Sequence, residues 1–165
     1  MIPETPLFTD DAKVLYDLLK REWSLPPGKE PSIAYDVRSQ VTSSRYAFIF
    51  VYMINRSTRI ASVDYNQLER TSYLGIKIDA TFRENFLEVV QEVERILMAN
   101  RRPGKTGLGG YTYLEMTAER FTNDLSGYYS CTLDVRMTSH NTPLRVAGMG
   151  SPVNEMVQDG CIKNR

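Results

Sequence analysis

Residues 73–97 read YLGIKIDATFRENFLEVVQEVERIL and hold the clearest structural pattern in the sequence. Tyr73, Ile76 and Ile78 favour a β-strand over Tyr73–Ala80. Next, Thr81-Phe-Arg-Glu84 matches a capping box, in which a hydroxyl and a carboxylate each satisfy a free backbone amide. Apolar residues then recur at helical spacings of three and four: Phe86, Val89, Val90, Val93, Ile96 and Leu97. The stretch predicts a strand that leads directly into a long helix, which ends before Pro103-Gly104.

A second amphipathic helix is predicted near the start of the sequence. It opens at Thr9, whose hydroxyl is a suitable cap, and Asp10 and Asp11 sit favourably at the positive end of the helix dipole. Val14, Leu15, Leu18 and Leu19 mark its buried face. The helix should end before Leu25-Pro26-Pro27-Gly28, because paired prolines cannot continue it.

Two further strands are predicted between these helices. Ile33, Tyr35 and Val37 alternate over a short stretch that favours a first strand. Residues 46–54 are apolar or aromatic throughout, which predicts a central strand covered on both faces. Asn55 to Arg70 is polar and lacks clear periodicity, so we expect a long excursion there, with a hairpin arm as one form of it.

A hairpin is predicted after a glycine-rich linker at Gly104–Gly110. Its strands are Tyr111–Phe121 and Tyr129–Met137, joined by a turn at residues 123–127. The second strand alternates apolar and polar residues, which indicates one buried and one wet face. Periodicity fails after Met137, so Thr138–Arg165 is expected to be a tail that orders only against a partner.

These elements predict an α/β (α+β) fold: a twisted, mixed but largely antiparallel sheet with two main helices packed mostly on one face. Residues 1–137 form the single predicted domain and 138–165 a C-terminal tail or assembly arm. The long helix either makes a right-handed crossover between parallel strands or turns the chain back antiparallel, and both connections remain open.

Composition argues against a charged partner. The sequence has 165 residues, with 20 basic and 20 acidic side chains. This balance provides no overall field that would concentrate the protein on nucleic acid or an anionic membrane. The sequence shows neither a membrane-spanning apolar run nor a secretory signal, so we expect folding in the cytosol and no membrane partner.

The sequence predicts no catalytic, cofactor-binding or metal-binding site. His140 is the only histidine, and the two cysteines, Cys131 and Cys161, are distant from each other and are expected to be free thiols. Gly104-Lys105-Thr106 lacks the full phosphate-loop pattern. One enzymatic alternative stays open, a small metal-dependent hydrolase that would use Asp64, Asp79 or Asp134.

Candidate interface residues lie in two polar segments. The long excursion mixes both charge signs, which is typical of oligomer contacts, although a solvated face explains such a pattern equally well. The tip of the last hairpin adds two more polar residues. The predicted subunit or partner interface therefore comprises Arg56, Arg59, Asp64, Glu69, Arg70, Asn123 and Asp124.

The order of elements resembles the tail terminator proteins of long-tailed bacterial and archaeal viruses. The resemblance covers roughly Asp10 to Met137. It rests on the N-terminal amphipathic helix, the proline-bounded strand before Ile33, the strand Tyr73–Ala80 leading into the helix at Thr81, and the hairpin from Leu114 to Val135. The length of the Asn55–Arg70 excursion and of the Thr138–Arg165 tail departs from the family pattern.

This resemblance implies a structural virion protein in the tail or neck, assembled in the host cytoplasm. Such a protein forms a ring, expected to be a hexamer, that caps the head-proximal end of the tail tube and stops its growth. The implied partners are other copies of the chain, the tail tube protein and a head connector or head-closure protein, while DNA passes through without specific binding. A head-closure or head–tail joining protein, and a monomeric ligand-binding module, are the alternatives.

Overall fold

The computed structural model describes residues 10–35, 46–60, 68–102, 111–123 and 127–141. In chain order the elements are α1 (Asp11–Glu22), β1 (Ser32–Ala34), β2 (Phe48–Ile60), β3 (Leu68–Ala80), α2 (Arg83–Ala99), β4 (Tyr113–Asn123) and β5 (Tyr129–Asn141). All the predicted helices and strands are present. Val37 and the Gly104–Gly110 linker lie outside the described residues.

The described strands form one sheet in the order β1-β2-β3-β5-β4. β1 pairs with β2 in parallel, and every other neighbouring pair is antiparallel. The mixed, largely antiparallel sheet predicted from the sequence is therefore confirmed. β3 and β4 run parallel with β5 between them, so α2 makes a crossover connection rather than a simple antiparallel return.

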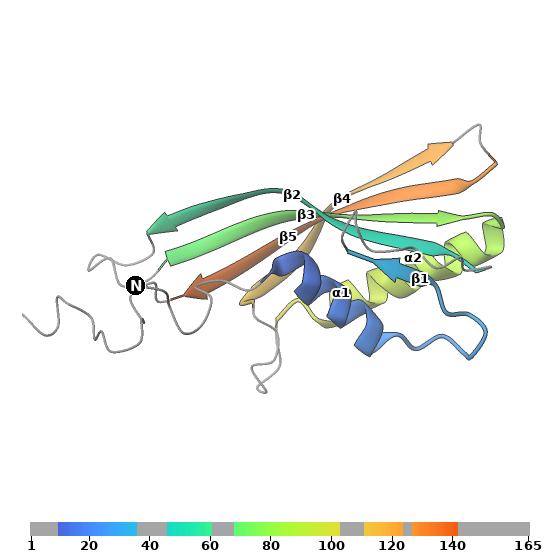
Figure 1. The fold of residues 1–165 in the computed structure, drawn as a ribbon, viewed down its shortest axis with the longest axis horizontal. Coiled ribbons are helices and arrows are strands. Elements are labelled where there is room, and N and C mark those ends of the chain that lie inside the picture. The colour runs from blue at the N-terminus through green and yellow to red at the C-terminus, as the bar shows by residue number, and fades with distance from the viewer. Residues whose placement is uncertain (1–9, 36–45, 61–67, 103–110, 124–126, 142–165) are drawn as a thin grey trace, which may run out of the picture.

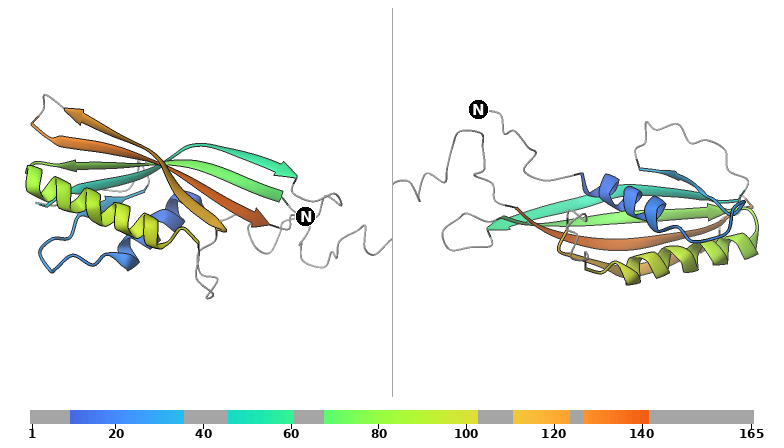
Figure 2. Two further views of the ribbon diagram at one scale, coloured as in Figure 1. Left: turned by 180° about the vertical axis from the view of Figure 1, so that it is seen from behind. Right: turned by 90° about the horizontal axis from the view of Figure 1, so that it is seen from below.

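Both helices cover the same face of the sheet (Figures 1 and 2). Between helices and sheet lies one apolar core, which includes Leu15 of α1, Ile76 of β3 and Val93 of α2, all fully buried. β2 lies between β1 and β3, as predicted for a central strand. The described helices cover one of its faces, and Phe48 and Phe50 on the other face are only half-buried, so the prediction of cover on both faces is wrong. Among the described helices none is long and apolar enough to span a membrane.

The helix starts differ from the sequence-based predictions. Asp10 caps α1, since its Oδ1 accepts from the amide of Ala12 at 3.1 Å, and Thr9 lies outside the described residues. The capping box at Thr81 is wrong. Phe82 is the N-cap of α2 without a side-chain cap bond, and its carbonyl accepts from the Phe86 amide at 3.0 Å. The helix thus begins one residue later than the box requires.

Polar side chains anchor α1 near both of its ends. At the start, Asp11 is buried and pairs with Arg70 of β3 at 3.2 Å between Oδ2 and Nη2, while the Ser72 hydroxyl donates to the same carboxylate. Just past the end, Oε1 of the buried Glu92 accepts from the amide and the hydroxyl of Ser24, both at 2.8 Å. The helix is therefore fixed to the sheet at one end and to α2 at the other.

Beyond the helices, β2, β3 and β5 continue as a ribbon (Figure 1). We call residues 55–60 and 68–72 the hairpin arm. Arg59 lies opposite Glu69 and Ser57 opposite Thr71, so the described residues of the predicted polar excursion belong to two paired strands. β5 extends to Asn141, four residues past the predicted strand end at Met137, because residues 138–141 pair with the arm strand of β3.

Candidate functional site

The sheet face opposite the helices is the candidate functional site, and we call it the open face. Strand alternation places on it side chains from all four long strands. From β2 and β3 these are Phe48, Phe50, Tyr52, Asn55, Ser57, Arg59, Glu69, Thr71, Tyr73, Lys77 and Asp79, and from β4 and β5 they are Tyr113, Glu115, Ala118, Arg120, Thr122, Ser130, Thr132, Asp134, Arg136 and Thr138.

Charges on the open face are balanced in ion pairs. The described strands place four cationic side chains there, and each contacts a carboxylate on the same face. The pairs are Arg59–Glu69 at 2.6 Å, Lys77–Asp79 at 3.4 Å, Arg120–Asp134 at 2.8 Å and Arg136–Glu115 at 2.5 Å. The hydrogen bond from Arg59 to Glu69 raises the pKa of the guanidinium, which keeps this pair charged. The face therefore offers many polar groups but no net charge.

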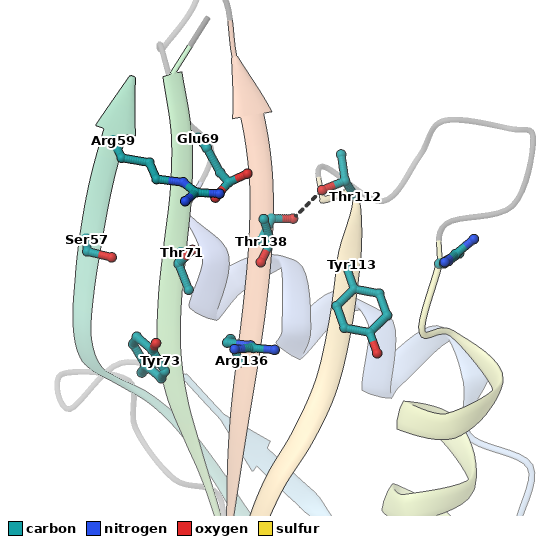
Figure 3. Close-up of a pocket in the computed structure, with 10 residues that line it drawn as sticks. Ser57, Arg59, Glu69, Thr71, Tyr73, Thr112, Tyr113, Arg136 and Thr138 are labelled. Atoms are coloured by element: carbon teal, nitrogen blue, oxygen red, sulfur yellow. Dashed lines mark hydrogen bonds and ion pairs between the residues drawn. The ribbon is translucent and has the colours of Figure 1, made fainter. Parts of the chain in front are cut away.

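A shallow trough of about 750 Å³ crosses the arm end of the open face. Figure 3 shows Arg59 and Glu69 at its outer end and Tyr73, Arg136 and Tyr113 at its inner end. Thr112 at its side donates a hydrogen bond to the Thr138 carbonyl at 3.0 Å. Hydroxyls, tyrosine rings, paired charges and the exposed Arg102 line the trough. This mixture suits contact with a protein surface rather than acid–base or metal chemistry.

The structure brings together some of the predicted interface residues. Arg59 and Glu69 pair across the hairpin arm, and Arg56 is exposed on the same arm strand. Asn123 is the last residue of β4, at the opposite end of the molecule from the arm. Asp64 and Asp124 lie outside the described residues. Sequence reasoning did not find Tyr73 of β3, nor Arg136 and Thr138, which join the trough because β5 flanks the arm.

Arg70 has a different environment from its neighbours in the predicted set. Its side chain is 4% exposed and lies under the helices, paired with Asp11. The signal was present in the sequence, because Arg70, Ser72, Leu74 and Ile76 continue one alternating face of β3. Arg70 therefore contributes to packing of α1 on the sheet within this subunit.

The residues considered for hydrolysis do not form a cluster. Asp79 accepts from the Ser130 hydroxyl at 2.5 Å. Asp134 lies four residues after Ser130 on β5 and pairs instead with Arg120 of β4. No group of three or more potential metal ligands occurs among the described residues. Burial raises the pKa of the Cys131 thiol to about 12, so it is protonated at neutral pH and is a poor nucleophile. Asp64, His140's side chain and Cys161 lie outside what the structure describes.

Comparison with known proteins adds one informative match. No protein-family model matches the sequence, and no curated protein matches it. Among solved structures, a cryo-EM structure of the sheath/tube terminator of the extracellular contractile injection system PVC, in its extended state, has a TM-score of 0.52. The sequences are 14% identical, and the match covers 92% of this chain and 61% of that chain. The likeness concerns the fold and extends over nearly the whole length of this chain, so the protein has a terminator-like fold.

Proposed function

We propose that this protein is a tail terminator. In this proposal its subunits form a ring, with a hexamer as the expected size, at the head-proximal end of a tail tube. The ring stops growth of the tube and offers its other side to a head connector or head-closure protein. The observation that carries the proposal is the structural match to a sheath/tube terminator over 92% of the chain.

Properties of the open face support an assembly role over an enzymatic one. The four cations that the described strands place on this face are already paired with carboxylates, so they are not available to bind a substrate. A sheet face that exposes tyrosines and paired charges resembles the mixed surfaces through which protein subunits meet. The same balance allows DNA to pass nearby without being held, because binding to phosphates requires unpaired cations.

The proposal is tested with tail tubes assembled from purified tube protein. Tubes are grown with and without the terminator, and their lengths and ends are examined by negative-stain electron microscopy. We expect rings at one end of each tube and a shorter mean length as the terminator concentration rises. The mass of the protein alone, measured by light scattering after size exclusion, should show a hexamer or a monomer that becomes a ring on tube ends.

Two further arms separate the terminator from other neck proteins. A head-closure protein would bind purified connector but leave tube growth unchanged, whereas a terminator must alter tube length without a connector present. Calorimetry with Mg²⁺, Mn²⁺ and Zn²⁺ addresses the hydrolase alternative. A protein that stays monomeric, ignores tubes and binds a divalent ion tightly would overturn the proposal.

A further inference from the structure

Two segments of strand edge are exposed at opposite corners of the sheet. On β2, residues 54–60 are all exposed, because β1 covers the edge only at Phe48–Phe50. On β4, residues 117–122 are all exposed, whereas at Leu114 the edge is covered, since its amide donates to the Arg101 carbonyl at 2.8 Å. Unpaired edges of this length normally pair with another strand or are protected.

The peptide groups on both edges have matching orientations. The amide of Leu114, a helix-facing residue of β4, points away from β5 toward Arg101. Beyond the irregularity between Met116 and Ala118, the helix-facing residues are Glu119 and Phe121, so their amides also point away from β5. β2 and β4 are antiparallel on opposite edges, so a half-turn about the sheet normal relates them. The helix-facing residues of β2, Arg56 and Thr58, therefore also turn their peptide groups outward.

Side chains on the two edges are complementary. Ile54, in the irregularity of β2 between Met53 and Asn55, is 48% exposed, and Phe121 on β4 is 60% exposed on the far side from Phe86, so both present apolar surface at the edges. Arg56 makes no ion pair within the described part of the chain. Glu119 lies close to Glu94 of α2, and burial together with this second carboxylate raises the pKa of Glu94. A cation beside Glu119 would relieve the repulsion between the two carboxylates.

We infer that β2 of one subunit pairs antiparallel with β4 of the next, with Arg56 opposite Glu119 and Ile54 opposite Phe121, so that the sheets join around the ring. This inference rests on the proposed function, since it names the contact that closes the terminator ring. The contact is heterologous, as ring closure requires, because two different edges meet. Strand directions alternate without a break across the joint.

The positions of the edges set a stagger between subunits. Within one subunit Arg56 is level with Ser72 of β3, and Glu119 is level with Ile76, four residues away. Four residues span roughly 14 Å, and the four strand spacings from one β2 to the next span roughly 19 Å. These lengths correspond to a strand tilt of about 35° to the ring axis, as in closed β-barrels. β1 of the neighbouring subunit covers its β2 at Phe48–Phe50. In this register those residues come after the end of β4 at Asn123, so β1 does not block the joint.

The stagger also decides which face lines the ring. In Figure 3, seen from the open face with the arm upward, β2 lies at the left and β4 at the right. A neighbour joined to the lower part of β4 sits lower along the strands, so the strands tilt to the left in this view. The right-handed twist of strands requires a tilt to the right when a barrel is seen from outside. The helices therefore lie outside, and the charge-balanced open face lines the channel.

Charge reversal tests the joint. Arg56→Glu and Glu119→Arg should each lower the ring fraction measured by light scattering, with at least a tenfold rise in the concentration needed for assembly. The combined variant should recover most of the ring, because the pair is restored with reversed signs. Lys20→Glu is the matched control, since Lys20 is exposed in the last turn of α1 and belongs to neither edge. Thermal melts should show that all the variants fold.

Cross-linking gives a second readout. Ile54→Cys with Phe121→Cys should yield a disulfide ladder under oxidation that stops at the ring size. The background is Cys131→Ala with Cys161→Ser, because Cys131 lies opposite position 121 within the subunit and would compete for the new thiol. Normal ring formation by both charge-reversal variants, together with no ladder from the cysteine variant, would overturn the edge pairing while leaving the terminator function intact. A wild-type chain that remains monomeric with and without tubes would overturn both.

Discussion

Asp11 of α1 and Arg70 of β3 form an ion pair, 3.2 Å between Oδ2 and Nη2, in which the two side chains are only 1% and 4% exposed. Their positions are 59 residues apart in the sequence. Removing two charges from water is costly, and the attraction between them offsets that cost only while both are present. This pair is thus a sensitive point of contact between the N-terminal helix and the hairpin arm.

Loss of one partner should therefore destabilise the fold strongly. We expect Asp11→Ala to lower the free energy of unfolding in urea by about 3–5 kcal/mol, because it leaves Arg70 buried without its carboxylate. The double variant Asp11→Leu, Arg70→Met should lose much less. Lys13→Ala is the control, since the pair of Lys13 with Asp17 is exposed to water and should contribute little to stability. Equal losses from Asp11→Ala and Lys13→Ala would contradict the burial.

Glu92 should make stability depend on pH. Hydrogen bonds from Arg95, and then from Ser24, lower the pKa of Glu92 to about 2, against an ordinary value of 4.5. The folded state thus favours the carboxylate, so this stabilisation is present above pH 4.5 and is lost as the pH falls from 4.5 toward 2. Urea unfolding across this range should show a smaller loss of stability for Glu92→Gln than for the wild type. Glu88→Gln is the control, because the Glu88 side chain is 41% exposed and its ion pair with Lys29 is screened.

Val93→Asp should abolish cooperative thermal unfolding. Val93 is fully buried on the face of α2 that packs on the sheet, and a carboxylate there would have no partner. Gln91→Asp, exposed on the same helix, should melt close to the wild type by circular dichroism. A cooperative melt of Val93→Asp near the wild-type temperature would show that this helix face tolerates a charge.

Truncation should distinguish the end of β5 from the residues that follow it. A chain cut after Asn141 should melt like the full-length protein but assemble less well, if residues 142–165 serve as an assembly arm. A chain cut after Met137 should be less stable, because it loses the buried Ser139 and the Thr138 carbonyl that accepts from the Thr112 amide at 2.7 Å. Identical melting of the two truncated chains would show that the last residues of β5 add nothing to the fold.

The Tyr52 ring should determine which side chains can be tolerated at position 75. A Cβ at Gly75 would collide with Cζ of Tyr52, whose ring covers the glycine across β2 and β3. Gly75→Ala should therefore cost about 1–3 kcal/mol on urea unfolding, because the ring must move. In a Tyr52→Ser background the same change should cost much less, and additive losses would show that the ring does not set the limit.

The elements were predictable where hydrophobic periodicity is strong. The spacing from Phe86 to Leu97 predicts α2, and the alternation from Cys131 to Met137 predicts the inner face of β5. The strand ends were not predictable, because the hairpin arm has polar residues on both faces. Arm strands hold together through pairing with each other, which leaves little trace in hydrophobicity. The sheet order was also hidden, since β5 inserts between β3 and β4.

The candidate site was only partly predictable for a related reason. Mixed charge in the excursion indicated an interface, and Arg59 and Glu69 do lie together in the trough. Arg136 and Glu115 come from strands far along the chain, and their contribution follows from sheet order rather than from any local pattern. The capping box failed because Thr81 lies just ahead of the N-cap residue, so its hydroxyl is out of position for the first free amides.

The two polar anchors of α1 also restrict how this region can change in length. Asp11 is tied to the sheet and Ser24 to α2, with the whole helix between them. One inserted or deleted residue would rotate one end against the other by roughly 100° and carry an anchor out of reach. Among relatives that keep both anchors, we expect insertions and deletions in this helix to be rare and to occur in whole turns.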